Sequence, residues 1–149
     1  METNVGLQDW LKSRWLIEHQ TSRQEIADLL GMADRDLGQC RTPNLSPEWQ
    51  PNIAFNAALQ AATAALAAAG YRAAREAHHY RVIQSLAHTI KADPILIAQL
   101  DKFRKKRNIS DYERAGVVSE QEAKEMYVLA KNLREEVKKW LRSNHPDLL

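Results

Sequence analysis

The sequence predicts an all-α fold, a single-domain bundle of five to six helices. Apolar residues recur at the three- and four-residue spacing of helices along almost the whole chain, and the alternation typical of strands is nearly absent. No internal repeat or low-complexity linker divides the chain. A length of 149 residues suits one domain with a buried core, so residues 1–149 are treated as a single unit.

The N-terminal part, residues 1–42, is expected to form a pair of helices. On the first, residues 6–20, one apolar stripe holds Leu7, Trp10, Leu11 and Trp15. The second, residues 21–37, opens with a capping box of Ser22 and Glu25. Its buried face is expected to hold Ile26, Leu29, Leu30, Ala33 and Leu37. Residues 40–52 carry three of the five prolines and are expected to be a connection.

An Ala-rich helix is expected over residues 53–69. Alanine favours helix strongly but buries little surface, so its main consequence is geometric. Another helix, from the same chain or from a second subunit, can approach it closely. Gly70 suits the left-handed residue that follows a helix, and residues 71–77 are expected to be a connection.

Three further helices complete the predicted bundle. The first covers residues 78–90, and the second covers residues 94–108 after a stop and restart at Asp93-Pro94. The third opens with a capping box of Ser119 and Glu122 and ends before Pro146. The inward positions of the three helices are Val82, Ile83, Leu86, Ile90, Ile97, Leu100, Phe103, Ala123, Met126, Tyr127, Ala130, Leu133, Val137, Trp140 and Leu141, and Arg104 is a further candidate for the inner edge of the second.

The composition limits the cell compartment and the class of partner. The formal net charge is only +2, so attraction for a polyanion must come from local clustering. Cys40 is the single cysteine, which excludes an intrachain disulfide and fits a reducing cytosol. Charged residues interrupt the N-terminus, and the longest apolar stretch, residues 57–69, is too short to span a bilayer. We therefore expect a cytoplasmic protein with no membrane partner.

Five cations crowd the seven residues 101–107, at the end of a predicted helix. The helix dipole stabilises a cation near a C-terminus by about 0.3–1 kcal/mol, which accounts for one or two of these charges. The remaining charges repel one another unless an anion is present. Phosphate is the obvious anion, because Lys and Arg on backbone phosphates supply most non-specific affinity for nucleic acids. A solvated helix end is the alternative explanation.

The histidines do not form a metal site. His78 and His79 are adjacent, so on a helix they point about 100° apart and cannot easily chelate one ion. The sequence has no HExxH motif, no Cys–His cluster and no phosphate-cradling glycine loop, so neither metal nor cofactor is expected. An enzyme with this sequence would therefore need a reaction that uses neither a metal ion nor a cofactor. RNA cleavage by the RNA's own 2′-hydroxyl meets that condition, since the protein supplies only a base, an acid and a cation.

Three stretches, taken in order, resemble a known family: "AFNAALQAATAALAAAG" (54–70), "HHYRVIQSL" (78–86) and "LDKFRKKRNISDY" (100–112). Their order resembles the HEPN superfamily of small helical domains, named for prokaryotic and eukaryotic nucleotide-binding proteins. It is most similar to bacterial HEPN proteins of unassigned function, whose second core segment ends in an Arg followed by Asp-Tyr. The resemblance implies a HEPN-like, up-and-down core over residues 53–145, with the N-terminal helical pair as an addition.

RNase members of that family carry an Arg, often followed by Asn, then four to six residues and a His. Two such motifs meet across a homodimer to form the cleaving site. Arg107-Asn108 fits the start of the motif, but Tyr112 stands where the His is expected. A tyrosine with a pKa of about 10 is a poor base at neutral pH, although it can donate a proton or a hydrogen bond to phosphate. The resemblance therefore leaves cleavage open.

His78 or His79 could supply the missing imidazole from the preceding helix. A second spacing of this type, Arg81 to His88, lies inside one amphipathic helix and lacks the Asn, so it is not assigned to the motif.

The leading hypothesis is a homodimeric HEPN-like protein that binds RNA or a nucleotide phosphate. Its expected phosphate-binding residues are Arg104, Lys105, Arg107, Asn108 and Asp111, and its candidate catalytic residues are Arg107, Tyr112, His78 and His79. Asp111 has a structural alternative, which is to pair with Arg107 and orient it. The second hypothesis is a non-catalytic dimerisation or partner-binding module, in which the Ala-rich helix and exposed tryptophans form a protein interface. The resemblance is compatible with it, because other HEPN proteins pair with a small nucleotidyltransferase in toxin–antitoxin or defence systems. A metal-independent ribonuclease is the third.

Overall fold

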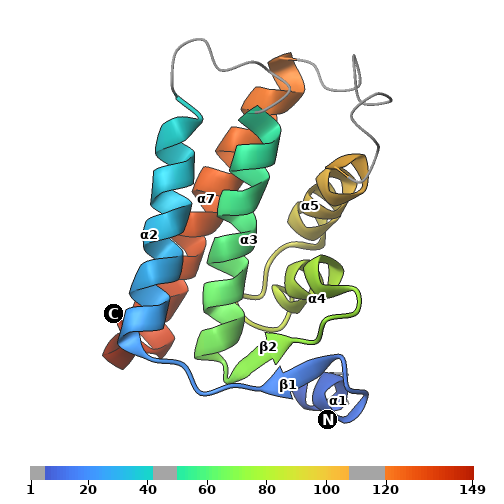
Figure 1. The fold of residues 1–149 in the computed structure, drawn as a ribbon, viewed down its shortest axis with the longest axis vertical. Coiled ribbons are helices and arrows are strands. Elements are labelled where there is room, and N and C mark those ends of the chain that lie inside the picture. Colours follow the sequence, from blue (N-terminus) through green and yellow to red (C-terminus); the bar gives the residue numbers. More distant parts are fainter. Residues whose placement is uncertain (1–5, 42–49, 108–119) are drawn as a thin grey trace.

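The computed structural model describes residues 6–41, 50–107 and 120–149 of the chain (Figure 1). These residues form six α-helices, one short 3-10 helix and one small antiparallel sheet of two strands. The expected all-α, single-domain bundle is confirmed. None of the described helices is long and apolar enough to cross a membrane.

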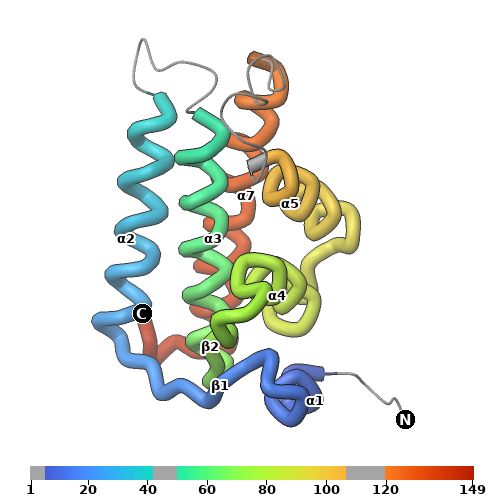
Figure 2. The backbone as a smooth tube through the Cα atoms, turned by 45° about the vertical axis from the view of Figure 1, so that its right-hand side comes forward, coloured from blue at the N-terminus to red at the C-terminus, as the bar shows by residue number. Residues whose placement is uncertain are grey.

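Three long helices stand side by side and form the larger part of the bundle. They are α2 (Arg23–Gln39), α3 (Gln50–Ala68) and α7 (Glu120–Asn144). Helices α3 and α7 run in the same direction, and α2 runs against both (Figures 1 and 2). The sequence sets up this packing, because each helix carries apolar residues at three- and four-residue spacing on one or more faces.

The shorter elements lie along the opposite side of α3 from α2 and at one end of the bundle (Figures 1 and 2). They are α1 (Leu7–Lys12), β1 (Leu16–Glu18), β2 (Tyr71–Ala73), α4 (His78–Ser85), α5 (Pro94–Arg107) and the 3-10 helix η1 (Pro146–Leu148). Helices α4 and α5 pack on α3 and on each other, and β2 connects α3 to α4.

Helix α3 is the centre of the core, in contact with α2, α7, α4 and α5. Its alanines are buried on several sides at once, and the fully or nearly fully buried ones are Ala54, Ala57, Ala58, Ala61, Ala62, Ala64, Ala65 and Ala67. Small side chains let neighbouring backbones approach closely, which confirms the geometric prediction for this helix. The larger side chains of the core, such as Phe55, Leu66 and Met126, fill the space between the helices.

The predicted helix ends are mostly confirmed. The Ser22 hydroxyl accepts the backbone N–H of Glu25 at 3.1 Å and caps α2. The second half of the expected capping box does not form, because the Glu25 carboxylate instead accepts from the Thr21 hydroxyl at 2.6 Å and meets His19. Gly70 adopts a φ of 101° just after α3, and Asp93 caps the start of α5 by accepting the N–H of Ile95 at 2.8 Å.

The expected helix over residues 6–20 is wrong beyond Lys12. Arg14 adopts a φ of 65°, and residues 16–18 then form β1, which pairs with β2 inside the segment expected to be a plain connection. The register sets Leu16 opposite Ala73, and both side chains are buried. Backbone pairing with a segment far along the chain therefore outweighs the local helical pattern. Helix α4 likewise ends at Ser85, and turns replace the expected helix over residues 86–90.

Candidate nucleic-acid interface

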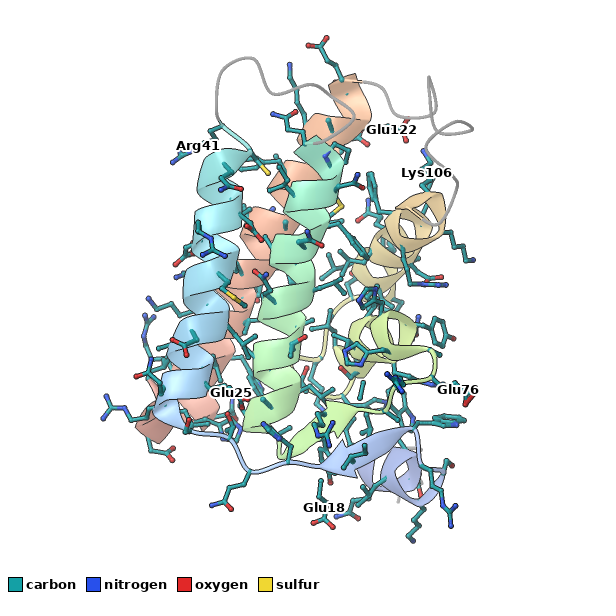
Figure 3. All side chains as sticks on the ribbon, viewed as in Figure 1. Glu18, Glu25, Arg41, Glu76, Lys106 and Glu122 are labelled. Atoms are coloured by element: carbon teal, nitrogen blue, oxygen red, sulfur yellow. The ribbon has the colours of Figure 1, made fainter. Side chains whose placement is uncertain are left out.

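The basic end of α5 is partly neutralised within the described chain. The Arg104 Nε donates to Asp101 Oδ1 at 2.6 Å, and the Lys105 ammonium lies 3.5 Å from the other oxygen of that carboxylate. Lys106 forms an ion pair with Glu122, which ties the end of α5 to the start of α7 (Figure 3). Three of the five cations therefore have a carboxylate neighbour, but the two carboxylates offset only two of the five positive charges. These partners come from one turn earlier and from another helix, which the count of cations did not include, and the binding of an external anion here stays a prediction.

Most of the predicted motif lies outside the part of the chain that the structure describes. Arg107 is the last residue of α5, but its side chain is not among the described ones. Asn108, Asp111 and Tyr112 fall in residues 108–119, which are likewise outside it. The expected pairing of Asp111 with Arg107, and the role of Tyr112, stay predictions.

His78 and His79 are the first two residues of α4, and both are exposed. Ala77 precedes them with a φ of 53°, which turns the chain from β2 into the helix. The two imidazole rings contact each other edge to face, with centroids 5.7 Å apart. The following residue, Tyr80, contacts Arg104 of the basic helix α5.

Two guanidinium groups alternate with two aromatic rings along this side of the molecule. The Arg81 guanidinium lies 3.6 Å from the centroid of the Trp15 ring and 5.4 Å from that of Tyr80. The Arg104 guanidinium lies 5.3 Å from the Tyr80 ring, on the α5 side. We call these four side chains, Trp15, Arg81, Tyr80 and Arg104, the arginine–aromatic row. It joins the turn before β1 to α4 and α5.

Arg81 has no carboxylate partner among the described residues. Its Nε is buried, and no acceptor within the described chain reaches it. A buried donor without a partner costs about 1–3 kcal/mol, so native proteins usually supply water or a ligand oxygen to such a group. Stacking on Trp15 and Tyr80 holds the guanidinium plane and leaves its charge uncompensated by any anion of the described chain.

A second pair of rings supports the row from α1. Trp10 is buried, and its ring contacts Trp15 at a centroid distance of 5.9 Å and His88 at 5.1 Å, both edge to face. Burial lowers the pKa of His88, and the nearby Lys91 ammonium lowers it further. The imidazole is therefore neutral at physiological pH and acts as a packing partner for α1.

Two other kinds of site, a metal centre and a reactive cysteine, are not found among the described residues. No group of three or more His, Cys, Asp and Glu side chains among them could hold a metal ion. Cys40 is buried beside Gln50, and burial, with a smaller contribution from Asp36, raises its pKa to about 11. It is a neutral thiol at neutral pH and therefore a poor nucleophile.

Sequence reasoning placed Arg104 and the histidine helix on one surface but missed three of the four residues of the row. Tyr80 and Arg81 form an aromatic–arginine pair beside two exposed histidines, and this signal was present in the sequence. Trp15 was expected on one apolar stripe of a helix over residues 6–20, whereas it lies just before β1 and is 38% exposed. Its contact with Arg81 depends on the pairing of β1 with β2, for which the sequence gives no local signal. Known protein families, curated proteins and solved structures offer no match to this chain.

Proposed function

We propose that this protein binds RNA or a nucleotide phosphate through the arginine–aromatic row, as the resemblance to HEPN domains leads us to expect. The observation that carries the proposal is the Arg81 guanidinium, which is stacked on Trp15 and has no anion partner in the described chain. Aromatic rings interleaved with cations are the recurring feature of surfaces that bind single-stranded nucleic acid, because rings take bases and cations take phosphates.

The charge around the row supports the same proposal. The segments that carry it, residues 14–18, 71–81 and 101–105, hold seven Arg or Lys side chains and three carboxylates. This surplus of four positive charges exceeds the net charge of +2 of the whole chain, so the charge is concentrated on this side. The seven cations are Arg14, Arg72, Arg75, Arg81, Lys102, Arg104 and Lys105, and the three carboxylates are Glu18, Glu76 and Asp101.

The test is RNA binding measured by fluorescence anisotropy at several salt concentrations. If Arg81, Arg104 and Lys105 each neutralise one phosphate, log Kd should rise with log salt at a slope of about 2. Arg81→Gln should weaken binding and lower that slope by about 0.7. The matched control is Arg134→Gln, since Arg134 donates to Asp34 at 2.8 Å and joins α7 to α2, on the other side of the bundle. Equal binding by the two variants, both with verified fold, would count against the row.

Cleavage is a separate outcome of the same experiment. RNA recovered after incubation in EDTA should be intact if the protein only binds it. Fragments that form with the wild type and are lost with Arg107→Ala would favour the ribonuclease hypothesis, in which Tyr112 or a histidine of α4 replaces the missing motif residue. Fragments from both proteins would point to a contaminating nuclease.

A second candidate function, self-association, is favoured by a groove of about 520 Å³ between α5 and α7. Its apolar lining includes Phe103 and Val128, and Val128 is 52% exposed. Lys102 and Glu125 lie along the same groove, so its opposite charges could pair with those of a second copy related by a two-fold axis. Val128→Glu should then shift the protein towards monomer in size-exclusion chromatography with light scattering. An unchanged mass would exclude this surface as the contact.

A further inference from the structure

The small sheet beside the row has one buried face and one open face. In β1, Leu16 is 2% exposed, whereas its neighbours Trp15 and Ile17 are 38% and 41% exposed. Successive side chains of a strand point to opposite faces, so Trp15 and Ile17 share the face away from the core. Arg72 lies opposite Ile17 in the register and is also exposed. We call Trp15, Ile17 and Arg72 the outer sheet face.

The backbone holds Trp15 in a fixed position. Its N–H donates to the Trp10 carbonyl at 2.9 Å, and its own carbonyl accepts the N–H of Ala74 at 2.9 Å. The Arg81 guanidinium stacks on the ring, and Trp10 contacts it edge to face. The ring is thus oriented before any ligand arrives, although more than a third of its surface stays in contact with water. Such preorganisation reduces the entropy that a ligand loses on binding.

We infer that the outer sheet face selects an unpaired nucleobase, so that the preferred ligand is single-stranded RNA rather than a duplex or a base-free polyanion. The inference rests on the proposed function, since Arg81, Arg104 and Arg72 supply the attraction for phosphate. It adds the chemical class of the ligand, an unpaired base, which the exposed ring of Trp15 indicates. An indole surface beside a guanidinium stacks on any base whose flat face is free. A duplex buries those faces in its own stack and offers phosphates, sugars and base edges but no free base face.

The surrounding charge favours this occupant over an apolar segment of another protein. Arg72 and Arg81 border Trp15 and Ile17, and the nearest carboxylate in β1, Glu18, points away from the bundle at the lower edge of the molecule (Figure 3). An apolar peptide would gain nothing from the two guanidinium groups. A nucleotide gains on both sides, because its base covers the ring and its phosphate meets the cations.

The experiment compares three probes at one salt concentration: a short labelled single-stranded RNA, the duplex of the same sequence, and inorganic polyphosphate. The wild type should bind the single strand about tenfold more tightly than either of the other two. Trp15→Leu should lose about tenfold in affinity for the single strand alone, with an unchanged salt slope because no charge is removed. Trp15→Phe keeps an aromatic face and should recover most of the preference, which separates stacking from loss of structure. Ile95→Ala, at a 68% exposed apolar residue on α5, is the matched control and should bind like the wild type.

A second readout is tryptophan fluorescence. Stacking of a base on Trp15 should quench it on addition of single-stranded RNA, and the quenching should be much reduced in Trp15→Leu. Equal affinity for single strand, duplex and polyphosphate would overturn the inference while leaving phosphate binding by the row intact. Salt-dependent binding that is unaffected by Trp15→Leu would also overturn it. No binding of any of the three probes would refute the proposed function and the inference together.

Discussion

Enlarging one alanine at the centre of the bundle tests how closely its helices pack. Ala61 lies in the middle of α3 and is 0% exposed. Ala61→Leu adds three carbon atoms where α3 touches several neighbouring helices, and overpacking of this kind typically costs about 1–3 kcal/mol. For a chain of this length, a loss of about 2 kcal/mol lowers Tm by about 4–8 °C. Helix propensity contributes little, because Leu ranks next to Ala.

The matched control is the same substitution at Ala27, an exposed residue of α2. Ala27→Leu should change stability by no more than about 0.5 kcal/mol, because its side chain stays in water. Both variants are compared with the wild type by urea unfolding, followed by circular dichroism, at one pH. The expected result is a lower midpoint for Ala61→Leu with the slope unchanged. Equal midpoints for the two variants would refute the close packing of α3.

Three further predictions concern pH, an ion pair and a turn. Because burial and Lys91 lower the pKa of His88 below its ordinary value of 6.5, stability should be complete above about pH 6.5 and fall as the pH drops through the lowered pKa. His88→Phe should flatten that part of the profile of Tm against pH. Reversing the charge of one partner, by Lys106→Glu or Glu122→Lys, should lower Tm, because this ion pair joins α5 to α7. The double variant, which carries both substitutions, should recover most of the lost Tm. Gly70→Ala should lower the free energy of unfolding in urea by about 1–2 kcal/mol, because Gly70 has a φ of 101°, which residues with a side chain rarely adopt. The added Cβ would meet nothing within 4 Å, so the cost comes from the backbone conformation alone.

Each of these has a result that would contradict it. A wild-type Tm that stays constant from neutral pH down to about pH 5 would mean that His88 is not desolvated against Trp10. Charge exchanges whose effects simply add would show that Lys106 and Glu122 do not interact in solution. Unchanged stability of Gly70→Ala would mean that the turn after α3 relaxes to a conformation open to any residue.

The site was only partly predictable, for a reason visible in its residues. Arg104 and Lys105 stood out as a basic cluster, and the histidines stood out at the start of a helix. The carboxylates that pair with these cations could not be recognised from the sequence. Asp101 lies within reach only once α5 is helical, and Glu122 belongs to the start of α7, 16 residues after Lys106. The sequence shows how many cations lie close together along the chain. Which of them pair with a carboxylate depends on the acidic side chains that folding brings near them.

The Trp15 contact illustrates the same limit more strongly. Residues 6–20 carry a helical pattern of apolar residues, and that pattern alone placed Trp15 on one stripe with Leu7, Trp10 and Leu11. The chain instead turns at Arg14 and pairs residues 16–18 with residues 71–73. This pairing buries Leu16 and turns Trp15 outward towards Arg81. No local signal distinguishes the two outcomes, because the deciding hydrogen bonds come from a distant segment.

The sequence by itself determined the all-α class, the positions of α2, α3, α5 and α7, and the left-handed turn at Gly70. These features follow from short-range rules: apolar spacing on a helix, helix caps, and the freedom of glycine at positive φ. Only the tertiary structure decided the small sheet, the ion pair between the end of α5 and α7, and the arginine–aromatic row. Each of these depends on contacts between segments far apart in the chain, whose free energy exceeds the weak preference of any local stretch.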